Sequence, residues 1–300
     1  MPPRPVHEPR RDDCPWCGSK RLRTRLRTPD LRHRRPGTFV VDACLDCAHA
    51  FQNPRLTVEG LELYAAHTDR RAVARRRLRA TARAMLPFGE PESWLDVGTG
   101  DALFPEAAKE LFAYTAFDGL DPTSRVERAH AADRLDEAHV GRLTSPEILS
   151  RLRGRYDVVS MLHHLEHTRD PRAELAAALT ALRPGGHLLI EVPDPASASA
   201  AVLGKWWHSY DQPRHLQLIP PANLRAELRA QGCEIVVTDR KAAHAPRDLA
   251  AAVSLYADRT RLRPAARTLT ALAAAADHLL APALCRTRFS NAYRIIARRP

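Results

Sequence analysis

From residue 93 onward, short apolar runs alternate with segments of helical periodicity. The apolar runs have the length of buried strands and lie at 94–97, 114–120, 137–140, 156–161, 187–192 and 233–239, the third being weak. Segments with helical spacing separate them, at 102–111, 124–132, 172–182 and 221–231. Strands that alternate with helices predict an α/β fold in which a doubly wound parallel sheet has helices on both faces.

The first strand runs directly into a glycine turn that opens a helix. This stretch reads Asp96-Val97-Gly98-Thr99-Gly100, and the second strand ends on another acid, Asp121. Glycines let a ligand approach the backbone closely, and an acid at the end of the next strand can bind ribose hydroxyls. Because ligands of such sheets bind at the carboxyl ends of the strands, the pattern predicts a nucleotide-like ligand.

Composition divides the chain into several parts. Residues 1–11 are rich in Pro and Arg without an apolar core, which excludes a secretory signal and predicts a disordered arm. Residues 12–50 hold paired cysteines, and residues 51–90 are expected to form a helical cap or linker. The main domain covers 91–300, in which an Ala-rich stretch at 241–285 predicts a helical insert.

The cysteine pattern points to a metal. Four of the six cysteines form two Cys-x-x-Cys pairs, Cys14 with Cys17 and Cys44 with Cys47. Two such pairs, separated by a hairpin-sized segment, suit a zinc ion held tetrahedrally by four thiolates. Four thiolates leave no open coordination position, and so small a segment needs the metal to fold, so we predict a structural zinc ribbon.

Charge narrows the picture less than the motifs do. The net charge is +11 over 300 residues, which favours acidic partners such as nucleic acid, phosphorylated substrates or anionic lipid. The positive residues are spread along the chain, and the dense run at 69–85 fits either a solvated helix or an anion-binding face. The most apolar window, 269–285, contains Asp277, His278 and Pro282, so no transmembrane segment is expected. With cysteine pairs typical of reducing compartments, this predicts a cytoplasmic protein.

The stretch from 93 to about 237 resembles class I S-adenosylmethionine-dependent methyltransferases. Asp96 to Asp101 is similar to the family's first motif, in which an acid and a Gly-x-Gly turn hold the methionine end of the cofactor, and Asp121 matches the ribose-binding acid. Leu165-Glu166-His167 and Leu182-Arg183-Pro184-Gly185-Gly186 are similar to the segments after the fourth strand and before the fifth.

The chain departs from the family pattern at two places. Ala102 replaces the third glycine, and the acid expected after the third strand is missing, so no adenine contact is assigned. The competing interpretation, an NAD-dependent dehydrogenase, would need a glycine where Leu103 stands, and it has no role for the Pro-Gly-Gly turn.

The resemblance implies a Rossmann-like sheet of seven strands. Its last strand, expected at 291–298, would be antiparallel and enter between the fifth and sixth strands. The implied cofactor is S-adenosylmethionine. The cofactor-binding residues expected from the match are Asp96, Gly98, Thr99, Gly100, Asp121, Pro122, Met161 and Leu162.

The segment at 204–220 is the candidate substrate-side loop. It resembles that of a subgroup with an N-terminal zinc ribbon, related to sugar C-methyltransferases, in which a histidine here is thought to act as base. This match makes His215 the first catalytic candidate and His164 the second, since imidazole accepts protons near neutral pH. The alternative is that His215 only pins the loop. The expected substrate pocket consists of His163, Trp206, Trp207 and Tyr210. Ordinary packing of a lid is the alternative for its aromatic members.

The observations leave three functions open. The first is a methyltransferase acting on an O, N or C atom of a small-molecule metabolite or sugar. The second is an RNA methyltransferase whose zinc ribbon and Arg-rich helix hold phosphates, although the module lacks clustered aromatics for base stacking. The third is a non-catalytic scaffold, which the intact Gly98, Gly100 and Asp121 oppose. The oligomeric state is left open.

Overall fold

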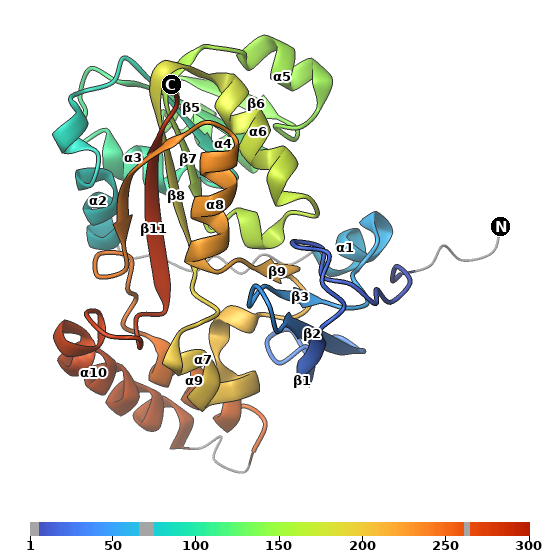
Figure 1. Cartoon of the computed structure of the whole chain (residues 1–300). Coiled ribbons are helices and arrows are strands. Elements are labelled where there is room, and N and C mark those ends of the chain that lie inside the picture. The colour runs from blue at the N-terminus through green and yellow to red at the C-terminus, as the bar shows by residue number, and fades with distance from the viewer. Residues whose placement is uncertain (1–5, 66–74, 261–264) are drawn as a thin grey trace. The chain divides into compact units, whose positions relative to one another are not determined.

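The chain forms two compact units, each assembled from separate stretches of sequence (Figure 1). The computed structural model describes residues 6–65, 75–260 and 265–300, so residues 1–5 of the expected arm and 69–74 of the basic run lie outside the described residues. The first unit comprises Met1–Asp69, Pro193–Asn223 and Ala243–Tyr293. The second unit comprises Arg70–Val192, Leu224–Ala242 and Arg294–Pro300.

This division differs from the contiguous domains expected from composition. The loop after the fifth expected strand and most of the helical insert belong to the same unit as the N-terminal cysteines. The basic helix from Arg75, expected in a cap or linker, belongs to the unit that contains the large sheet. Domain membership therefore follows tertiary contacts that composition does not record.

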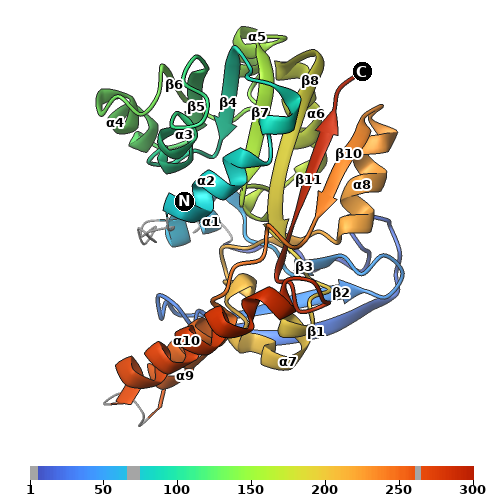
Figure 2. The same cartoon turned by 90° about the vertical axis from the view of Figure 1, so that its left-hand side faces the viewer.

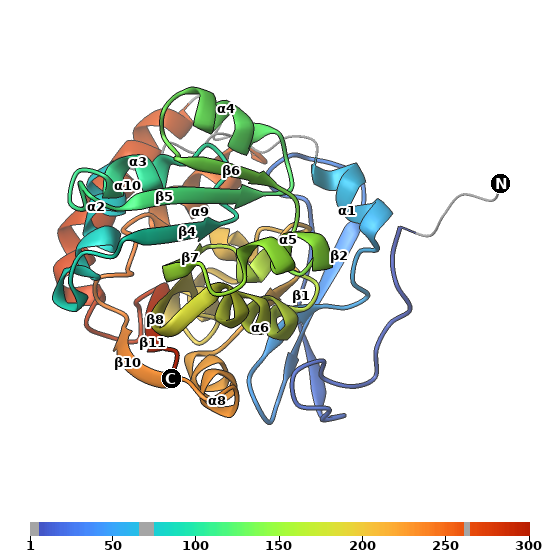
Figure 3. The same ribbon diagram turned by 90° about the horizontal axis from the view of Figure 1, so that it is seen from above.

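The second unit is built on a seven-stranded sheet with the strand order β10-β11-β8-β7-β4-β5-β6, which Figure 3 shows from above. The strands are β4 (Ser93–Val97), β5 (Ala116–Asp121), β6 (Glu137–Val140), β7 (Tyr156–Leu162), β8 (Leu182–Pro193), β10 (Glu234–Asp239) and β11 (Ala292–Arg298). β4 to β8 pair in parallel, whereas β11 pairs with β10 antiparallel. The expected doubly wound sheet and the antiparallel entry of its last strand between β8 and β10 are confirmed.

Helices cover both faces of this sheet. They are α2 (Arg75–Arg83), α3 (Leu103–Ala108), α4 (Arg125–Ala131), α5 (Pro146–Leu152), α6 (Pro171–Ala181) and α8 (Pro221–Ala230). Figure 2 shows α2, α3 and α4 on one side and α6 and α8 on the other. Trp94 lies at the centre of the core on the first side, where its ring packs on Phe104, Phe112 and Phe117 at centroid distances of 5.3–5.6 Å.

The first unit contains a four-stranded sheet with the order β1-β2-β3-β9. Its strands are β1 (Leu22–Pro29), β2 (Thr38–Cys44), β3 (Ala50–Gln52) and β9 (Gln217–Leu218), all paired antiparallel. The helices of this unit are α1 (Val58–Ala65), α7 (Ala198–Leu203), α9 (Asp248–Ala257) and α10 (Ala266–Leu284). The carboxylate of Asp277 on α10 accepts hydrogen bonds from the backbone N–H groups of Leu249 and Ala250 in the first turn of α9, which joins the two helices of the expected insert.

Two expectations for the N-terminal region are wrong. Residues 6–11 are not a disordered arm, because His7 bridges to Leu56 and the Arg10 guanidinium lies 2.5 Å from the buried carboxylate of Asp42. Residues 51–90 are not helical throughout, because β3 begins at Ala50 and continues to Gln52. All three residues of β3 are buried, and the strand is hydrogen-bonded to β2 on one side and β9 on the other. A pattern of three residues is too short to predict a strand from the sequence.

Two elements of the large sheet region also differ from expectation. α5 was not expected, although Ser145-Pro146 is a common start for a helix. β8 begins at Leu182, so the Pro184-Gly185-Gly186 segment lies inside the strand's bounds instead of ahead of it. Within the described ranges, none of the helices combines the length and apolar character needed to cross a bilayer.

Candidate cofactor and catalytic site

The glycine turn lies where β4 ends, beside the end of β5. Gly98 has φ +74° and Gly100 has φ +56°, a left-handed backbone that favours glycine. The Gly100 N–H donates to one carboxylate oxygen of Asp121 at 3.0 Å, and the Thr123 N–H donates to the other at 2.9 Å. Asp121 is therefore held in one orientation at the edge of the turn, the position expected for the ribose-binding acid.

Asp96 is held in place by a chain of two buried hydrogen bonds. The Trp94 indole N–H donates to Ser160 Oγ at 2.9 Å, and the Ser160 hydroxyl donates to Asp96 Oδ1 at 2.6 Å. Burial raises the pKa of Asp96 to about 6, so the carboxylate is mostly ionised at neutral pH. A buried negative charge next to a glycine turn suits the positively charged methionine end of the expected cofactor.

His164 packs directly against the glycine turn. A Cβ placed on Gly98 would lie 2.5 Å from His164 Nδ1, closer than real Cβ contacts allow. The other ring nitrogen, Nε2, lies 3.4 Å from the carboxylate of Glu174 on α6. Gly98 is thus required both by its backbone angle and by the imidazole beside it.

Glu191 is the centre of a buried ionic cluster near the end of β8. Its carboxylate receives hydrogen bonds from Arg77 at 2.6 Å, from Arg294 at 2.8 Å and from the Thr81 hydroxyl at 3.3 Å. The side chains of Glu191 and Arg294 are 3% and 1% exposed. Burial alone would raise the pKa of Glu191, but His163, Arg77 and Arg294 together hold it well below its usual range.

His163 extends this cluster beyond the end of β7. Its Nδ1 lies 3.2 Å from Glu166 Oε1 and its Nε2 lies 3.7 Å from Glu191 Oε1, while its backbone N–H donates to the Glu191 carbonyl at 2.8 Å. Burial alone would lower the pKa of His163, but the two carboxylates outweigh burial and raise it. The imidazole therefore holds its proton more strongly than an ordinary histidine does.

The remaining expected cofactor residues differ in exposure. Thr99 is partly buried within the turn and Pro122 is exposed just beyond β5. Met161 is completely buried in β7, and Leu162 is partly buried against the Trp94 core. Because β4 pairs in parallel with β5 and β7, the carboxyl ends of these three strands lie side by side. Most of the expected cofactor residues meet there, at or just beyond the ends of β4 and β5: Asp96, Gly98, Thr99, Gly100, Asp121 and Pro122.

His215 belongs to the first unit and is held in a defined tautomer. Its Nδ1–H donates to the Ser209 carbonyl at 2.7 Å, which makes Nε2 the basic nitrogen of the neutral ring. Nε2 lies 3.9 Å from the carboxylate of Asp211, which Arg32 and Arg214 also bind. Burial alone would raise the pKa of Asp211, but His215, Arg214 and Arg32 hold it below its usual range.

The three aromatic residues of the expected substrate pocket lie in different surroundings within the first unit. Trp207 and Tyr210 are 1% and 2% exposed and pack edge to face at 5.1 Å in an apolar core. Trp206 instead lines an apolar cavity of about 360 Å³ with Tyr256, whose ring is 5.3 Å away. His163 and His164, by contrast, belong to the second unit.

The four cysteines of the N-terminal pairs converge. Cys14 Sγ lies 3.7 Å from Cys47 Sγ, Cys17 Sγ lies 3.6 Å from Cys44 Sγ, and all four sulfurs lie within 4.8 Å of one another. Four thiolates around zinc at about 2.3 Å would be separated by about 3.8 Å. The donor set therefore fits a tetrahedral metal, whereas Cys233 and Cys285 lie outside the group.

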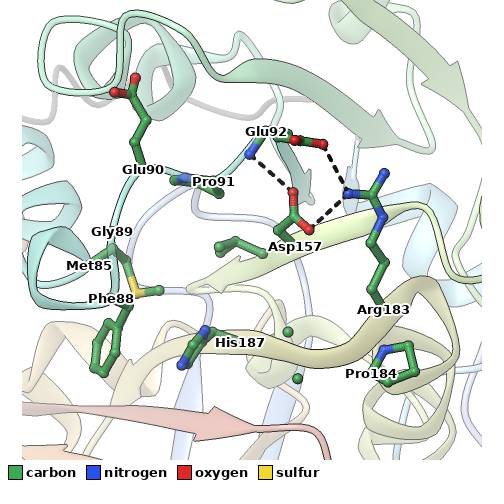
Figure 4. A pocket seen from close by; sticks show the side chains of 13 residues that line it. Met85, Phe88, Gly89, Glu90, Pro91, Glu92, Asp157, Arg183, Pro184 and His187 are labelled. Atoms are coloured by element: carbon green, nitrogen blue, oxygen red, sulfur yellow. Dashed lines mark hydrogen bonds and ion pairs between the residues drawn. The ribbon is translucent and has the colours of Figure 1, made fainter.

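A cavity of about 410 Å³ at the other edge of the large sheet holds none of the expected site residues (Figure 4). It lies where β4 and β7 begin. Arg183 binds Asp157 at 2.9 Å and approaches Glu92 at 3.5 Å, so these charges satisfy one another. Ligands of parallel sheets bind at the carboxyl ends of the strands, and this cavity lies at their amino ends, so the glycine turn remains the candidate cofactor site.

The sequence did not predict the ionic cluster around Glu191 or the ion pairs that the arginines of the basic helix α2 form. Arg75 and Arg79 of α2 both pair with Glu110, and Arg77 pairs with Glu191. These three arginines pair with carboxylates of the second unit, Arg75 and Arg79 at its exposed surface and Arg77 in a more buried position, so none of the three is a free anion-binding group. The residues lie far apart along the chain, so no motif links them.

The sheet order and the glycine turn define a Rossmann-like methyltransferase. A family model described as "Methyltransferase domain" matches residues 64–238, and the chain belongs to this family. The resemblance to class I S-adenosylmethionine-dependent methyltransferases seen in the sequence is confirmed.

Curated relatives carry the name ubiquinone biosynthesis O-methyltransferase. The protein from Xanthomonas axonopodis pv. citri (strain 306) is 30% identical over 148 residues, 47% of this chain and 62% of the relative. That from Azotobacter vinelandii (strain DJ / ATCC BAA-1303) is 31% identical over 148 residues, 47% of this chain and 64% of the relative. The chain therefore spans less than two thirds of the length of these relatives.

Solved structures support the fold. The 4+2 cyclase SpnF matches with a TM-score of 0.50 at 20% identity, covering 78% of this chain and 85% of that one. A putative sarcosine dimethylglycine methyltransferase from Galdieria sulphuraria matches with a TM-score of 0.50 at 14% identity, covering 74% and 85%. At these identities the likeness concerns the fold alone.

Proposed function

We propose that the protein transfers the methyl group of S-adenosylmethionine to a nucleophilic atom of a small molecule, with a hydroxyl oxygen as the first candidate. The observation that carries the proposal is the turn at Gly98 and Gly100, flanked by the oriented carboxylate of Asp121. The relatives named as O-methyltransferases support oxygen over nitrogen or carbon. The acceptor's carbon skeleton, a metabolite or a sugar, is left open.

The chain's own residues supply binding and position. S-adenosylmethionine, when bound, supplies a methyl group on a sulfonium sulfur, which a nucleophile displaces in line. The bare backbone of Gly98 and Gly100 permits close approach, and Asp121 offers a carboxylate to ribose hydroxyls. Asp96 presents a buried negative charge to the methionine end. Positioning of this kind accounts for much of the rate of a direct displacement.

His215 is the proposed proton acceptor for the substrate hydroxyl. Its Nδ1–H is committed to the Ser209 carbonyl, so the proton would pass to Nε2, and the nearby Asp211 carboxylate stabilises the imidazolium that results. His164, beside Gly98, is the second candidate. His163 is proposed to line the substrate side as a charged group instead, since two carboxylates face it.

The cofactor proposal can be tested by calorimetry. Asp121→Ala removes the carboxylate proposed for the ribose, and loss of charged hydrogen bonds predicts about 10- to 100-fold weaker binding of S-adenosylmethionine. Thr123→Val is the control, because it removes one donor to the same carboxylate but leaves the carboxylate in place. Unchanged affinity in Asp121→Ala would contradict the assignment.

The acceptor class can be tested by label transfer. Methyl-labelled S-adenosylmethionine should label hydroxylated small molecules in the presence of the enzyme, and His215→Gln should lose most of that turnover while keeping cofactor affinity. Label in purified RNA, with none in small molecules, would overturn the small-molecule proposal.

We propose that Cys14, Cys17, Cys44 and Cys47 bind one structural zinc ion. Elemental analysis should find one zinc per chain, and Cys44→Ser should bring the content well below one because a tetrahedral site loses a ligand. Cys233→Ser is the matched control, since it also replaces a buried cysteine but outside the group, and should keep the zinc. Full zinc retention in Cys44→Ser would refute the ligand set.

A further inference from the structure

The backbone carbonyls around His215 are bound by the amides of two buried glutamines in the first unit. Gln212 Nε2 donates to the His215 carbonyl at 2.6 Å and to the Tyr210 carbonyl at 3.0 Å. Gln52 Nε2 donates to the Pro213 carbonyl at 3.2 Å. Three carbonyls of the segment that carries His215 therefore depend on side-chain amides.

Gln52 sets the orientation of Gln212. Gln52 Nε2 also donates to Gln212 Oε1 at 2.8 Å, and Gln52 Oε1 accepts the Leu56 N–H at 2.9 Å. The Leu56 N–H can only donate and the Pro213 carbonyl can only accept, so the Gln52 amide has one allowed orientation. The Gln212 amide must then point its oxygen to Gln52 and its nitrogen to His215.

Gln52 contacts the same segment through its backbone. Its N–H donates to the Leu216 carbonyl at 2.8 Å, and the pairing of β3 with β9 continues from there, with Phe51 opposite Gln217. Gln52 and Gln212 are 2% and 6% exposed, so water does not replace these bonds readily. The segment around His215 is thus hydrogen-bonded to β3 both through the Gln52 side chain, at the Pro213 carbonyl, and through the Gln52 backbone, at the Leu216 carbonyl.

β3 is in turn fastened to the strand that ends at a cysteine of the metal group. β2 pairs with β3, with Val41 opposite Gln52, and β2 ends at Cys44. A continuous hydrogen-bonded path of strands and amides therefore leads from the cysteine group to the His215 segment.

We propose that Gln52 is a positioning residue for His215: through Gln212 it holds the segment in the conformation in which Nδ1–H reaches the Ser209 carbonyl and Nε2 is the basic nitrogen. This rests on the proposed role of His215 as proton acceptor. On this proposal the N-terminal sheet contributes to proton transfer from the substrate, because the Gln52 side-chain amide on β3 orients the segment that carries His215.

The test compares histidine tautomers in the full-length protein. Long-range ¹H–¹⁵N spectra of ¹⁵N-histidine-labelled protein, with His215 assigned by its loss in His215→Gln, report which ring nitrogen carries the proton. We expect the Nδ1–H form in the wild type at pH 8 and a loss of that single form in Gln52→Ala. Gln52→Glu is the second variant, because its carboxylate still accepts the Leu56 N–H at pH 8 but cannot donate to Gln212 or Pro213.

Asn53→Ala is the matched control. Asn53 is the next residue and equally buried, but its side chain bonds to Arg11 and Asp42. It should keep the Nδ1–H form while losing comparable stability in a thermal melt. The wild-type tautomer in both Gln52 variants, or the same tautomer loss in Asn53→Ala, would overturn the proposal.

S-adenosylmethionine affinity, measured by calorimetry on the same samples, should match the wild type in both Gln52 variants, because the glycine turn belongs to the second unit. A parallel loss of affinity would mean general unfolding and would also overturn the positioning role. The tautomer of His215 is measured without turnover, so the positioning role of Gln52 can fail while the methyltransferase proposal stands. Full turnover in His215→Gln would instead refute only the assignment of His215 as the base.

Discussion

Replacing Gly98 with alanine is expected to weaken the binding of S-adenosylmethionine strongly. The new Cβ would lie 2.5 Å from His164 Nδ1, so the imidazole or the turn must move. The left-handed φ of +74° adds strain of about 1–2 kcal/mol for any residue with a Cβ. Together these effects predict a loss of affinity of about 100-fold or more, measurable by calorimetry.

Gly154→Ala separates strain from crowding. Gly154 has a similar φ of +62°, but a Cβ there would meet no atom within 4 Å. The variant should lose a comparable amount of stability in a thermal melt and keep its affinity for the cofactor. If Gly98→Ala binds within a few-fold of the wild type, the turn does not contact the cofactor as proposed.

Replacing Glu191 with glutamine is expected to destabilise the protein by about 3–5 kcal/mol. The change leaves the guanidinium of Arg294, which is 1% exposed, without its counter-charge, and it removes the partner of Arg77 as well. Breaking a buried ion pair by removing one partner is costly because the other charge stays out of water. Urea unfolding at pH 6 measures the difference in free energy of unfolding.

Glu110→Gln is the matched control for this prediction. Glu110 also pairs with two arginines of α2, but Arg75 and Arg79 are 63% and 39% exposed. Exposed pairs contribute little, so the control should lose at most about 1 kcal/mol. An equal loss in both variants would contradict the importance of burial.

The pH dependence of the Glu191→Gln effect has a defined sign. The folded state lowers the pKa of Glu191, so its stabilising effect is present above the pKa of the unfolded carboxyl and is lost as the pH falls below about 4. The gap between wild type and variant should therefore narrow from pH 6 to pH 3. A gap that widens in acid would mean that the Glu191 charge does not stabilise the fold.

The parts of the molecule that could be predicted from the sequence are those decided locally. Gly98 and Gly100 reveal a turn because few other residues tolerate the backbone angles they adopt. The two Cys-x-x-Cys pairs predict a convergent group because two thiols three residues apart can face one ion, and the four sulfurs do converge. Alternating strands and helices predicted the large sheet for the same reason.

The parts that could not be predicted depend on contacts between distant residues. Glu191 meets Arg77 and Arg294, more than 100 positions away in either direction, and no spacing rule connects them. β3 is a three-residue strand that exists because β2 and β9 flank it, and β9 comes about 165 residues later. The link from Gln52 to His215 has the same origin.

The order in which the chain leaves the ribosome has a consequence for the first unit. The four cysteines of its proposed metal group have all been made once residue 47 is added, but β9 is made only at 217–218 and the last stretch of the unit ends at Tyr293. During synthesis β3 therefore presents an unpaired edge, the kind of surface on which strands of other chains can add. A metal captured early would hold β1 and β2 together through that interval. We expect chains starved of zinc during synthesis to aggregate before they can complete the unit, even if zinc is supplied afterwards.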